Sequence, residues 1–146
     1  MTLSKTTSSE KERLVAQEIE RELADLPTVD EGIIDRLRQL QASVSRPGED
    51  IVAELVRLFK RDSSSHLERI QKARVDEDLS VAVSSAHALK GASVAVGALR
   101  VAQVCAWLEV QVKGGRQKEV LIVAEAIDQE LSAANAALGV IVDEQS

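Results

Sequence analysis

Hydrophobic residues recur every three or four positions through most of the chain, which is the pattern of amphipathic helices. Together with the turn residues, this spacing predicts six helices, over about residues 10–25, 28–40, 49–73, 76–97, 98–113 and 116–138. No segment combines alternating hydrophobic and polar residues with hairpin-turn chemistry. The chain is therefore predicted to be all-α.

Short polar segments mark the helix boundaries. Pro27 ends the first helix, and Thr28 or Asp30 can cap the second. Gly97 follows the fourth helix, and the pair Gly114–Gly115 stops the fifth. Three successive serines in the third helix, at 63–65, weaken its helix propensity and are compatible with a kink.

The connections between the last four predicted helices are short, which favours antiparallel neighbours and an up-down-up-down four-helix bundle. We expect residues 1–9 to be a disordered tail, 10–27 an N-terminal helix that flanks or caps the bundle, 28–140 the bundle domain and 141–146 a second tail. Packing of the N-terminal helix on the bundle is the default expectation. Dimerisation through it is the alternative, and we expect a monomer.

Composition narrows the function classes. The 146 residues are 45% hydrophobic and 29% charged, with a net charge of −6, whereas a nucleic-acid-binding domain needs a basic face. The polar N-terminus has no signal-peptide pattern, and no apolar run approaches the roughly 18 residues of a membrane span. A single cysteine fits a reducing compartment. We therefore expect a cytoplasmic domain with no membrane or nucleic-acid partner.

The most informative segment is residues 86–97, AHALKGASVAVG. His87 lies about 100° around the helix from core-facing Ala86, with Lys90 and Gly91 three and four positions further on. Glycine inside a helix costs about 0.5–1 kcal/mol relative to alanine, and at position 91 it would clear space for a partner's backbone. This patch therefore suits an exposed histidine that reacts with another protein.

The chemistry that this patch supports is phosphoryl transfer. A neutral imidazole is a nucleophile near pH 7, and a lysine one turn away can offset the charge of the phosphoryl oxygens. We expect His87 to be the acceptor, with Lys90, Gly91, Ser84 and Val94 in contact with the phosphoryl group or the partner. We expect no cofactor or metal bound by this chain, and place any Mg²⁺ on the partner.

The segment resembles the histidine phosphotransfer (HPt) domain family. The resemblance is carried by Ala86–Gly91, by Gly97–Ala98 and by the pattern Cys-x-x-Leu-Glu at 105–109, and it extends over about residues 30–138, with Phe59 matching a recurrent aromatic. It implies a four-helix bundle that relays phosphoryl groups between receiver-domain aspartates. His87 would be the acceptor, Lys90 a phosphoryl contact and Gly91 the clearance for the receiver. The implied partners are receiver domains of response regulators and hybrid sensor kinases.

Other residues have simpler interpretations. We expect His66 to be a surface side chain, Cys105 a small buried hydrophobe, and Trp107 an edge of the core or a partner contact. Five basic residues form either a solvated face or a surface that steers an acidic receiver: Arg57, Lys60, Arg61, Lys72 and Arg74.

Three other function classes compete with the phosphorelay intermediate. A helical adaptor of the same fold would bind a receiver or kinase without carrying phosphate. A helical scaffold would bind no receiver, and a metal or triad enzyme would need ligands or a base that the sequence does not supply. The chain also has no phosphate-binding glycine loop, so we do not expect a kinase or other enzyme.

Overall fold

The computed structural model describes residues 8–44, 46–115 and 120–143 of the chain. Within these ranges all regular structure is helical, which confirms the all-α prediction. The helices are α1 (Ser8–Leu23), α2 (Glu31–Val44), α3 (Ile51–Val75), α4 (Leu79–Val96), α5 (Leu99–Lys113) and α6 (Val120–Asp143). Both α2 and α6 run a few residues further than expected. Of the predicted tails 1–9 and 141–146, residues 8–9 belong to α1 and 141–143 to α6, because these helices begin earlier and end later than expected. Residues 1–7 and 144–146, and the expected start of the last helix at 116–119, lie outside the described residues.

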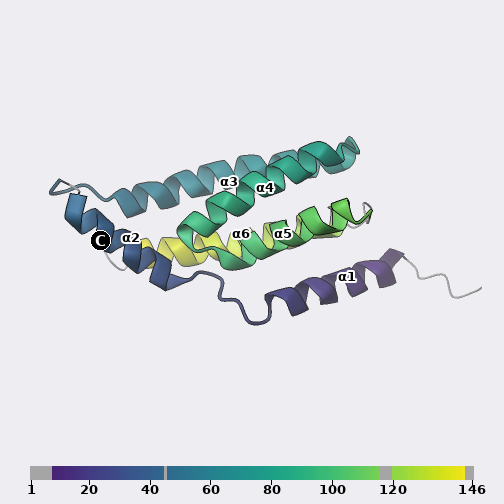
Figure 1. The fold of residues 1–146 in the computed structure, drawn as a ribbon, viewed down its shortest axis with the longest axis horizontal. Coiled ribbons are helices and arrows are strands. Elements are labelled where there is room, and N and C mark those ends of the chain that lie inside the picture. The colour runs from purple at the N-terminus through teal and green to yellow at the C-terminus, as the bar shows by residue number, and fades with distance from the viewer. Residues whose placement is uncertain (1–7, 45, 116–119, 144–146) are drawn as a thin grey trace, which may run out of the picture.

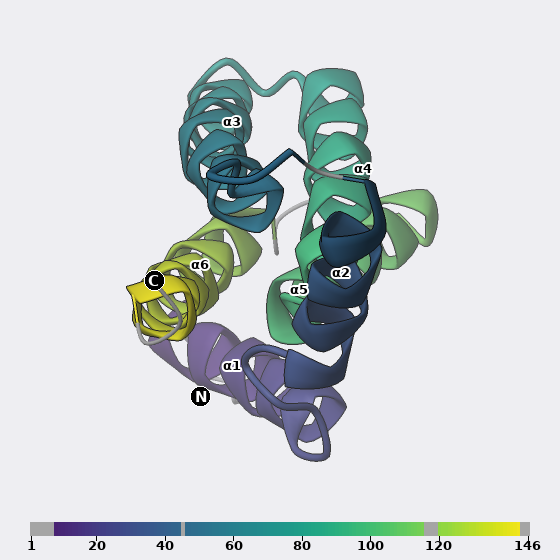
Figure 2. The same cartoon turned by 90° about the vertical axis from the view of Figure 1, so that its left-hand side faces the viewer.

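The last four helices form the predicted bundle. Helices α3 and α5 each pack against both α4 and α6, so the four surround one core (Figures 1 and 2). The completely buried side chains are mostly aliphatic: Ile70, Leu89, Val101, Val104, Leu108, Val123, Ile127 and Leu138 among them. Burial of this apolar surface is the main favourable term that holds the bundle together.

The N-terminal helix α1 lies along α5 and α6, as Figure 2 shows from the end of the bundle. Its buried stripe is Val15, Ile19 and Leu23. Arg100 of α5 secures the end of this helix, because its Nη1 donates to the carbonyl oxygens of Leu23 and Leu26, at 3.0 and 3.4 Å. In the structure this helix folds back on the bundle.

Helix α2 packs against α3 and α4 and crosses the end of the bundle (Figure 1). Its Arg38 donates from Nη2 to the carbonyl oxygen of Ile141, at 3.0 Å, near the end of α6. Ile141 lies in the last turn of α6, where the carbonyl oxygens have no further N–H within the helix to bind.

A close backbone contact joins the start of α2 to the end of α4. Gly97 ends α4 with a φ of 80°, and a Cβ there would lie 2.8 Å from the carbonyl oxygen of Asp30. The amide of Asp30 donates to the carbonyl of Gly97 at 2.8 Å, and its carboxylate accepts from Gly32 N. Asp30 is therefore the cap expected for α2, and glycine at 97 is needed for both conformation and space.

Helix α4 begins at Asp78, one of the two aspartates expected there. The Asp78 carboxylate accepts from Ser80 Oγ at 2.8 Å and from Val81 N at 3.3 Å. The hydrogen bond from Ser80, followed by that from Val81, lowers the pKa of this carboxyl. Asp78 and Gly97 thus fix both ends of the helix that carries His87. Helix α3 continues through Ser63–Ser65, where the Oγ atoms of Ser63 and Ser64 donate to the carbonyl of Lys60.

By length and mean hydropathy, one described helix, α4, could cross a membrane. The prediction that no segment approaches such a span is therefore wrong for Leu79–Val96. The helix is apolar because one of its sides packs in the core of the bundle. Ala82, Ala86 and Leu89 are completely buried in the bundle, while the opposite side of the helix carries the exposed His87.

Candidate functional site

His87 projects from the outer side of α4 near the middle of the bundle. The helix turns Ala86 and Leu89 into the core, which leaves the two intervening residues, His87 and Ala88, on the surface. The His87 side chain is 72% exposed. The sequence prediction of an accessible imidazole on this helix is therefore matched by its position.

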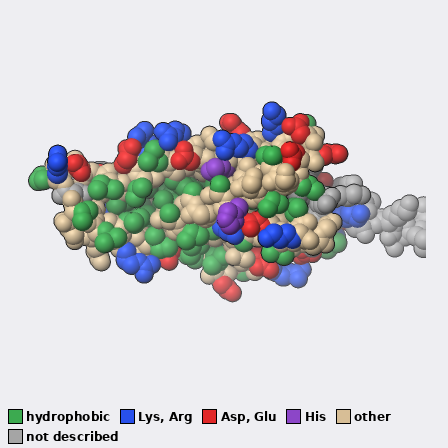
Figure 3. Space-filling view, turned by 45° about the horizontal axis from the view of Figure 1, so that its top comes forward, with side chains coloured by type: hydrophobic (Ala, Val, Ile, Leu, Met, Phe, Trp, Pro, Cys, Tyr) green, Lys and Arg blue, Asp and Glu red, His purple; other side chains and the backbone are tan. Residues whose placement is uncertain are grey.

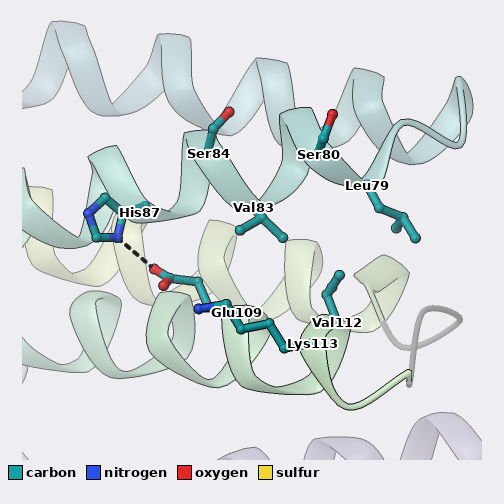
Figure 4. A pocket seen from close by; sticks show the side chains of 8 residues that line it. All are labelled: Leu79, Ser80, Val83, Ser84, His87, Glu109, Val112 and Lys113. Carbon is teal, nitrogen blue, oxygen red and sulfur yellow. Dashed lines mark hydrogen bonds and ion pairs between the residues drawn. The ribbon is translucent and has the colours of Figure 1, made fainter.

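Glu109 of α5 lies directly behind this imidazole. Its Oε1 is 3.3 Å from His87 Nδ1 and 3.1 Å from Lys90 Nζ (Figure 4). The Glu109 side chain is only 11% exposed, whereas that of Lys90 is 31% exposed. One buried carboxylate oxygen therefore holds both the histidine and the lysine, and joins α4 to α5.

This contact decides which ring nitrogen is reactive. A carboxylate can only accept a hydrogen bond, so the contact requires a proton on Nδ1. In the neutral ring, the lone pair is then on Nε2. Figure 4 shows the ring's other nitrogen on the side away from Glu109. The site thus presents a nucleophilic Nε2 at the surface.

Lys90 lies where helical spacing predicts, and its ammonium group is paired with Glu109. The buried carboxylate requires such a partner, because burying an unpaired charge is unfavourable. The sequence predicts Lys90 as a phosphoryl contact, whereas in the structure a carboxylate also competes for its ammonium group.

A groove of ≈ 590 Å³ extends from His87 toward the start of α4 and the end of α5 (Figure 4). Its lining is mainly apolar at the base, with polar side chains around it: Leu79, Ser80, Val83, Ser84, His87, Glu109, Val112 and Lys113. Ser84 thus lies on the groove side of His87, where its Oγ donates to the carbonyl of Val81.

The other two predicted contact residues lie on the far side of His87 along α4. A Cβ built on Gly91 meets no atom within 4 Å, so the glycine faces open space and no contact within the described structure requires it. Val94, one turn further, is 50% exposed. Four of the five predicted residues are therefore exposed along α4: Ser84, His87, Gly91 and Val94. The fifth, Lys90, is joined to His87 through Glu109.

The remaining candidates lie outside this surface. Cys105 is completely buried, and burial, with a smaller effect from Glu109, raises the pKa of its thiol to about 12, so the thiol stays protonated near pH 7. Trp107 is buried in the core, as its core-edge interpretation expected. His66 is half-buried rather than on the surface, and its Nδ1 has no hydrogen-bond partner among the described residues.

The basic residues of α3 are tied into local pairs at two positions. Arg57 pairs with Glu54, which raises the pKa of the guanidinium, and Arg61 pairs with Asp62 at 3.2 Å. Both pairs are exposed and favour the interpretation as a solvated face. Within the described ranges, no three His, Cys, Asp or Glu side chains come together as metal ligands would.

Comparison with known families tests the resemblance seen in the sequence. A family model described as the Hpt domain matches residues 54–138, which is more than half of the chain. The chain belongs to the Hpt domain family. The match includes α4 and α5 and therefore the whole His87–Lys90–Glu109 site of this Hpt domain.

Two solved structures share the fold of this Hpt domain. Histidine-containing phosphotransfer protein B (HptB) from Pseudomonas aeruginosa PAO1 aligns with a TM-score of 0.68 at 21% identity, covering 77% of this chain and 92% of the other. The maize histidine-containing phosphotransfer protein ZmHP2 aligns with a TM-score of 0.71 at 22% identity, covering 90% of this chain and 97% of the other. A search of curated proteins found no match.

Glu109 is the functional residue that the sequence analysis missed, although it ends the Cys-x-x-Leu-Glu pattern of the Hpt domain. The signal was present, because it is the only charged residue between Val101 and Val112. A charged residue in such an apolar segment is expected to be paired if it is buried. Its partners lie on another helix, so the sequence around it does not identify them.

Proposed function

We propose that this chain is a phosphorelay intermediate in which His87 accepts a phosphoryl group from a receiver-domain phospho-aspartate and passes it to an aspartate of a second receiver. The observation that carries the proposal is the exposed imidazole of an Hpt domain with Nδ1 against a buried carboxylate. The names of the two structural neighbours, both histidine-containing phosphotransfer proteins, support it.

The proposed reaction is a direct displacement at phosphorus. The Nε2 lone pair forms a bond to phosphorus, while the bond between phosphorus and the aspartyl oxygen breaks and its electron pair returns to the aspartate. Passing the group on reverses these steps with a second carboxylate. Because the transition state is loose, the protein contributes mainly the position of the nucleophile and positive charge. Here Glu109 positions the imidazole and Lys90 supplies the positive charge.

The surface around His87 suits a protein partner. Figure 3 shows histidine at the surface beside a broad region of hydrophobic side chains that extends toward the end of the bundle where α2 lies. Exposed apolar side chains occur on three helices near this end: Leu40, Val44, Leu55 and Val94. Such exposed apolar surface marks sites of protein association. In this proposal Gly91 leaves room for the receiver, and Ser84 and Val94 contact it.

The remaining parts of the proposal follow from this role. The protein acts as a monomeric cytoplasmic carrier without kinase activity, and binds neither nucleic acid nor membrane. The Mg²⁺ that assists phosphoryl transfer is held by the receiver.

The proposal is tested by incubating the protein with a ³²P-phosphorylated receiver domain. We expect a label on this chain that is stable in base and labile in acid, and that is lost in His87→Gln. His66→Gln is the matched control, since it removes the other histidine, and should still be labelled. Labelling of His87→Gln contradicts the assignment, and receiver binding without any labelling would favour the non-phosphorylated adaptor.

A further inference from the structure

In the resting protein the ammonium group of Lys90 is already paired with Glu109. The lysine and the imidazole contact the same oxygen, Oε1 of Glu109, at 3.1 and 3.3 Å. While the ring is in its neutral, nucleophilic form, Lys90 is the cation that balances the buried carboxylate. This arrangement leaves the ammonium group occupied while Nε2 is still free.

Phosphorylation changes the charges around that oxygen. When Nε2 bonds to phosphorus and Nδ1 keeps its proton, the ring itself becomes positively charged. A dianionic phosphoryl group appears at the same time on the ring nitrogen that faces away from Glu109 (Figure 4). Glu109 then has a cation in direct contact at Nδ1, while the phosphoryl oxygens bring new negative charge to the other side of the ring.

Lys90 is placed to respond to this change. It lies one turn beyond His87 on α4, and its ammonium group is one carboxylate oxygen away from the ring. A flexible four-carbon stem lets a lysine ammonium move between nearby acceptors. Its new partner would be the stronger one, since a phosphoryl group carries about two negative charges.

We propose that Lys90 changes partner on phosphorylation, leaving Glu109 Oε1 for the phosphoryl oxygens while the charged imidazole takes its place as the counter-ion of Glu109. Glu109 is thus a positioning residue in both states. In the resting protein Glu109 holds the Lys90 ammonium group in an ion pair. This ion pair opens only when the phosphoryl group is present. This inference deepens the proposed function and depends on phosphorylation of His87.

The test is a double-mutant cycle with Lys90→Met and Glu109→Gln, measured by melting temperature before and after phosphorylation. The phosphodonor is phosphoramidate, so that no receiver is involved. The donor's P–N bond breaks as Nε2 bonds to phosphorus, and the departing nitrogen takes a proton and leaves as ammonia. In the unphosphorylated protein, the decreases in melting temperature of the two single variants should add up to about 3 °C more than the decrease of the double variant. In the phosphorylated protein this excess should fall to about 1 °C or less.

Two controls accompany the cycle. The same cycle on Arg100→Met and Glu130→Gln, an ion pair at 2.7 Å on the far side of α5, should show equal coupling in both states. His87→Gln treated with phosphoramidate should keep the resting coupling between Lys90 and Glu109. Coupling between Lys90 and Glu109 that persists in fully phosphorylated protein overturns the partner exchange.

The ³¹P chemical shift of the phosphohistidine gives a second measurement. It should change in Lys90→Met and stay unchanged in Lys113→Met, which removes the lysine that lines the groove. An unchanged shift in Lys90→Met, or a change only in Lys113→Met, overturns the exchange. If phosphoramidate does not phosphorylate His87 at all, it is the proposed function that fails.

Discussion

Glu109 lies behind the imidazole of His87, with its Oε1 3.3 Å from Nδ1, although the two residues are 22 positions apart in the chain. The contact joins α4 to α5, and orients a ring that is otherwise exposed to solvent. A nucleophile that is mobile on a helix surface would have to be ordered each time a partner arrives. The carboxylate supplies that order in advance, and it does so without covering Nε2.

Replacement of this carboxylate should therefore change the tautomer. In Glu109→Gln, the amide can donate to Nδ1 as well as accept from it, so the fraction of ring with its proton on Nε2 should rise. The ¹⁵N shifts of the ring nitrogens measure that fraction. A hydrogen bond to a charged group contributes about 1.5–3 kcal/mol, so phosphorylation by a receiver should slow by about tenfold or more. Glu130→Gln is the control, and an unchanged tautomer with an unchanged rate would contradict the positioning role.

Gly91 should matter to a protein donor and not to a small one. A Cβ at this position meets nothing within 4 Å, so Gly91→Gln should fold and place its side chain in open space beside His87. We expect slower transfer from a phosphorylated receiver and an unchanged rate with phosphoramidate. Equal rates for wild type and variant with the receiver would show that the partner does not need this space.

Substitution by alanine should change the stability of the fold in opposite directions at Gly91, inside α4, and at Gly97, its C-cap. Gly91→Ala removes a helix-interior glycine without a clash and should stabilise the fold by about 0.5–1 kcal/mol. Gly97→Ala places a Cβ 2.8 Å from the carbonyl of Asp30 at a φ of 80°, and should destabilise it by at least about 1–2 kcal/mol. Urea denaturation measures both, and a Gly97→Ala protein as stable as the wild type would mean that the α2–α4 junction adapts freely.

Arg100 should control the attachment of α1. It donates to the carbonyl of Leu23, the last residue of α1, and to that of Leu26 just beyond it. It also pairs with Glu130, which raises the pKa of the guanidinium. Arg100→Met keeps the apolar stem, so hydrogen exchange should quicken in residues 10–23 and change little in α4. Phosphorylation of His87 should be retained, because the helix lies away from α4 (Figure 2). Unchanged protection of α1 would show that Val15, Ile19 and Leu23 hold it without the arginine.

Much of the fold was predictable because the determinants of each helix are local. The hydrophobic spacing, Asp30 and Asp78 as caps and Gly97 as a stop are contained in a few consecutive residues, and the helices observed agree with them. The extra length of α2 and α6 was not predicted, since helix ends are set partly by tertiary contacts. The bond from Arg38 to the carbonyl of Ile141 is such a contact, between residues 103 positions apart.

The candidate site was predictable to the extent that it belongs to one helix. Helical spacing places Lys90 beside His87, and the cost of an interior glycine made position 91 informative. The role of Glu109 was not predictable in the same way, because it depends on how α5 faces α4. That relation also changes the interpretation of Lys90, which the sequence treats as a free cation and the structure pairs with a carboxylate.

The most direct test of the account is a chase with two receivers. A ³²P-labelled first receiver is mixed with this protein, and an unlabelled second receiver is then added. The amount of label on each of the three proteins is measured over time. We predict that the label appears on His87 and then on the second receiver, and that His87→Gln blocks the transfer between the receivers. Transfer that proceeds equally well with His87→Gln would contradict the central claim.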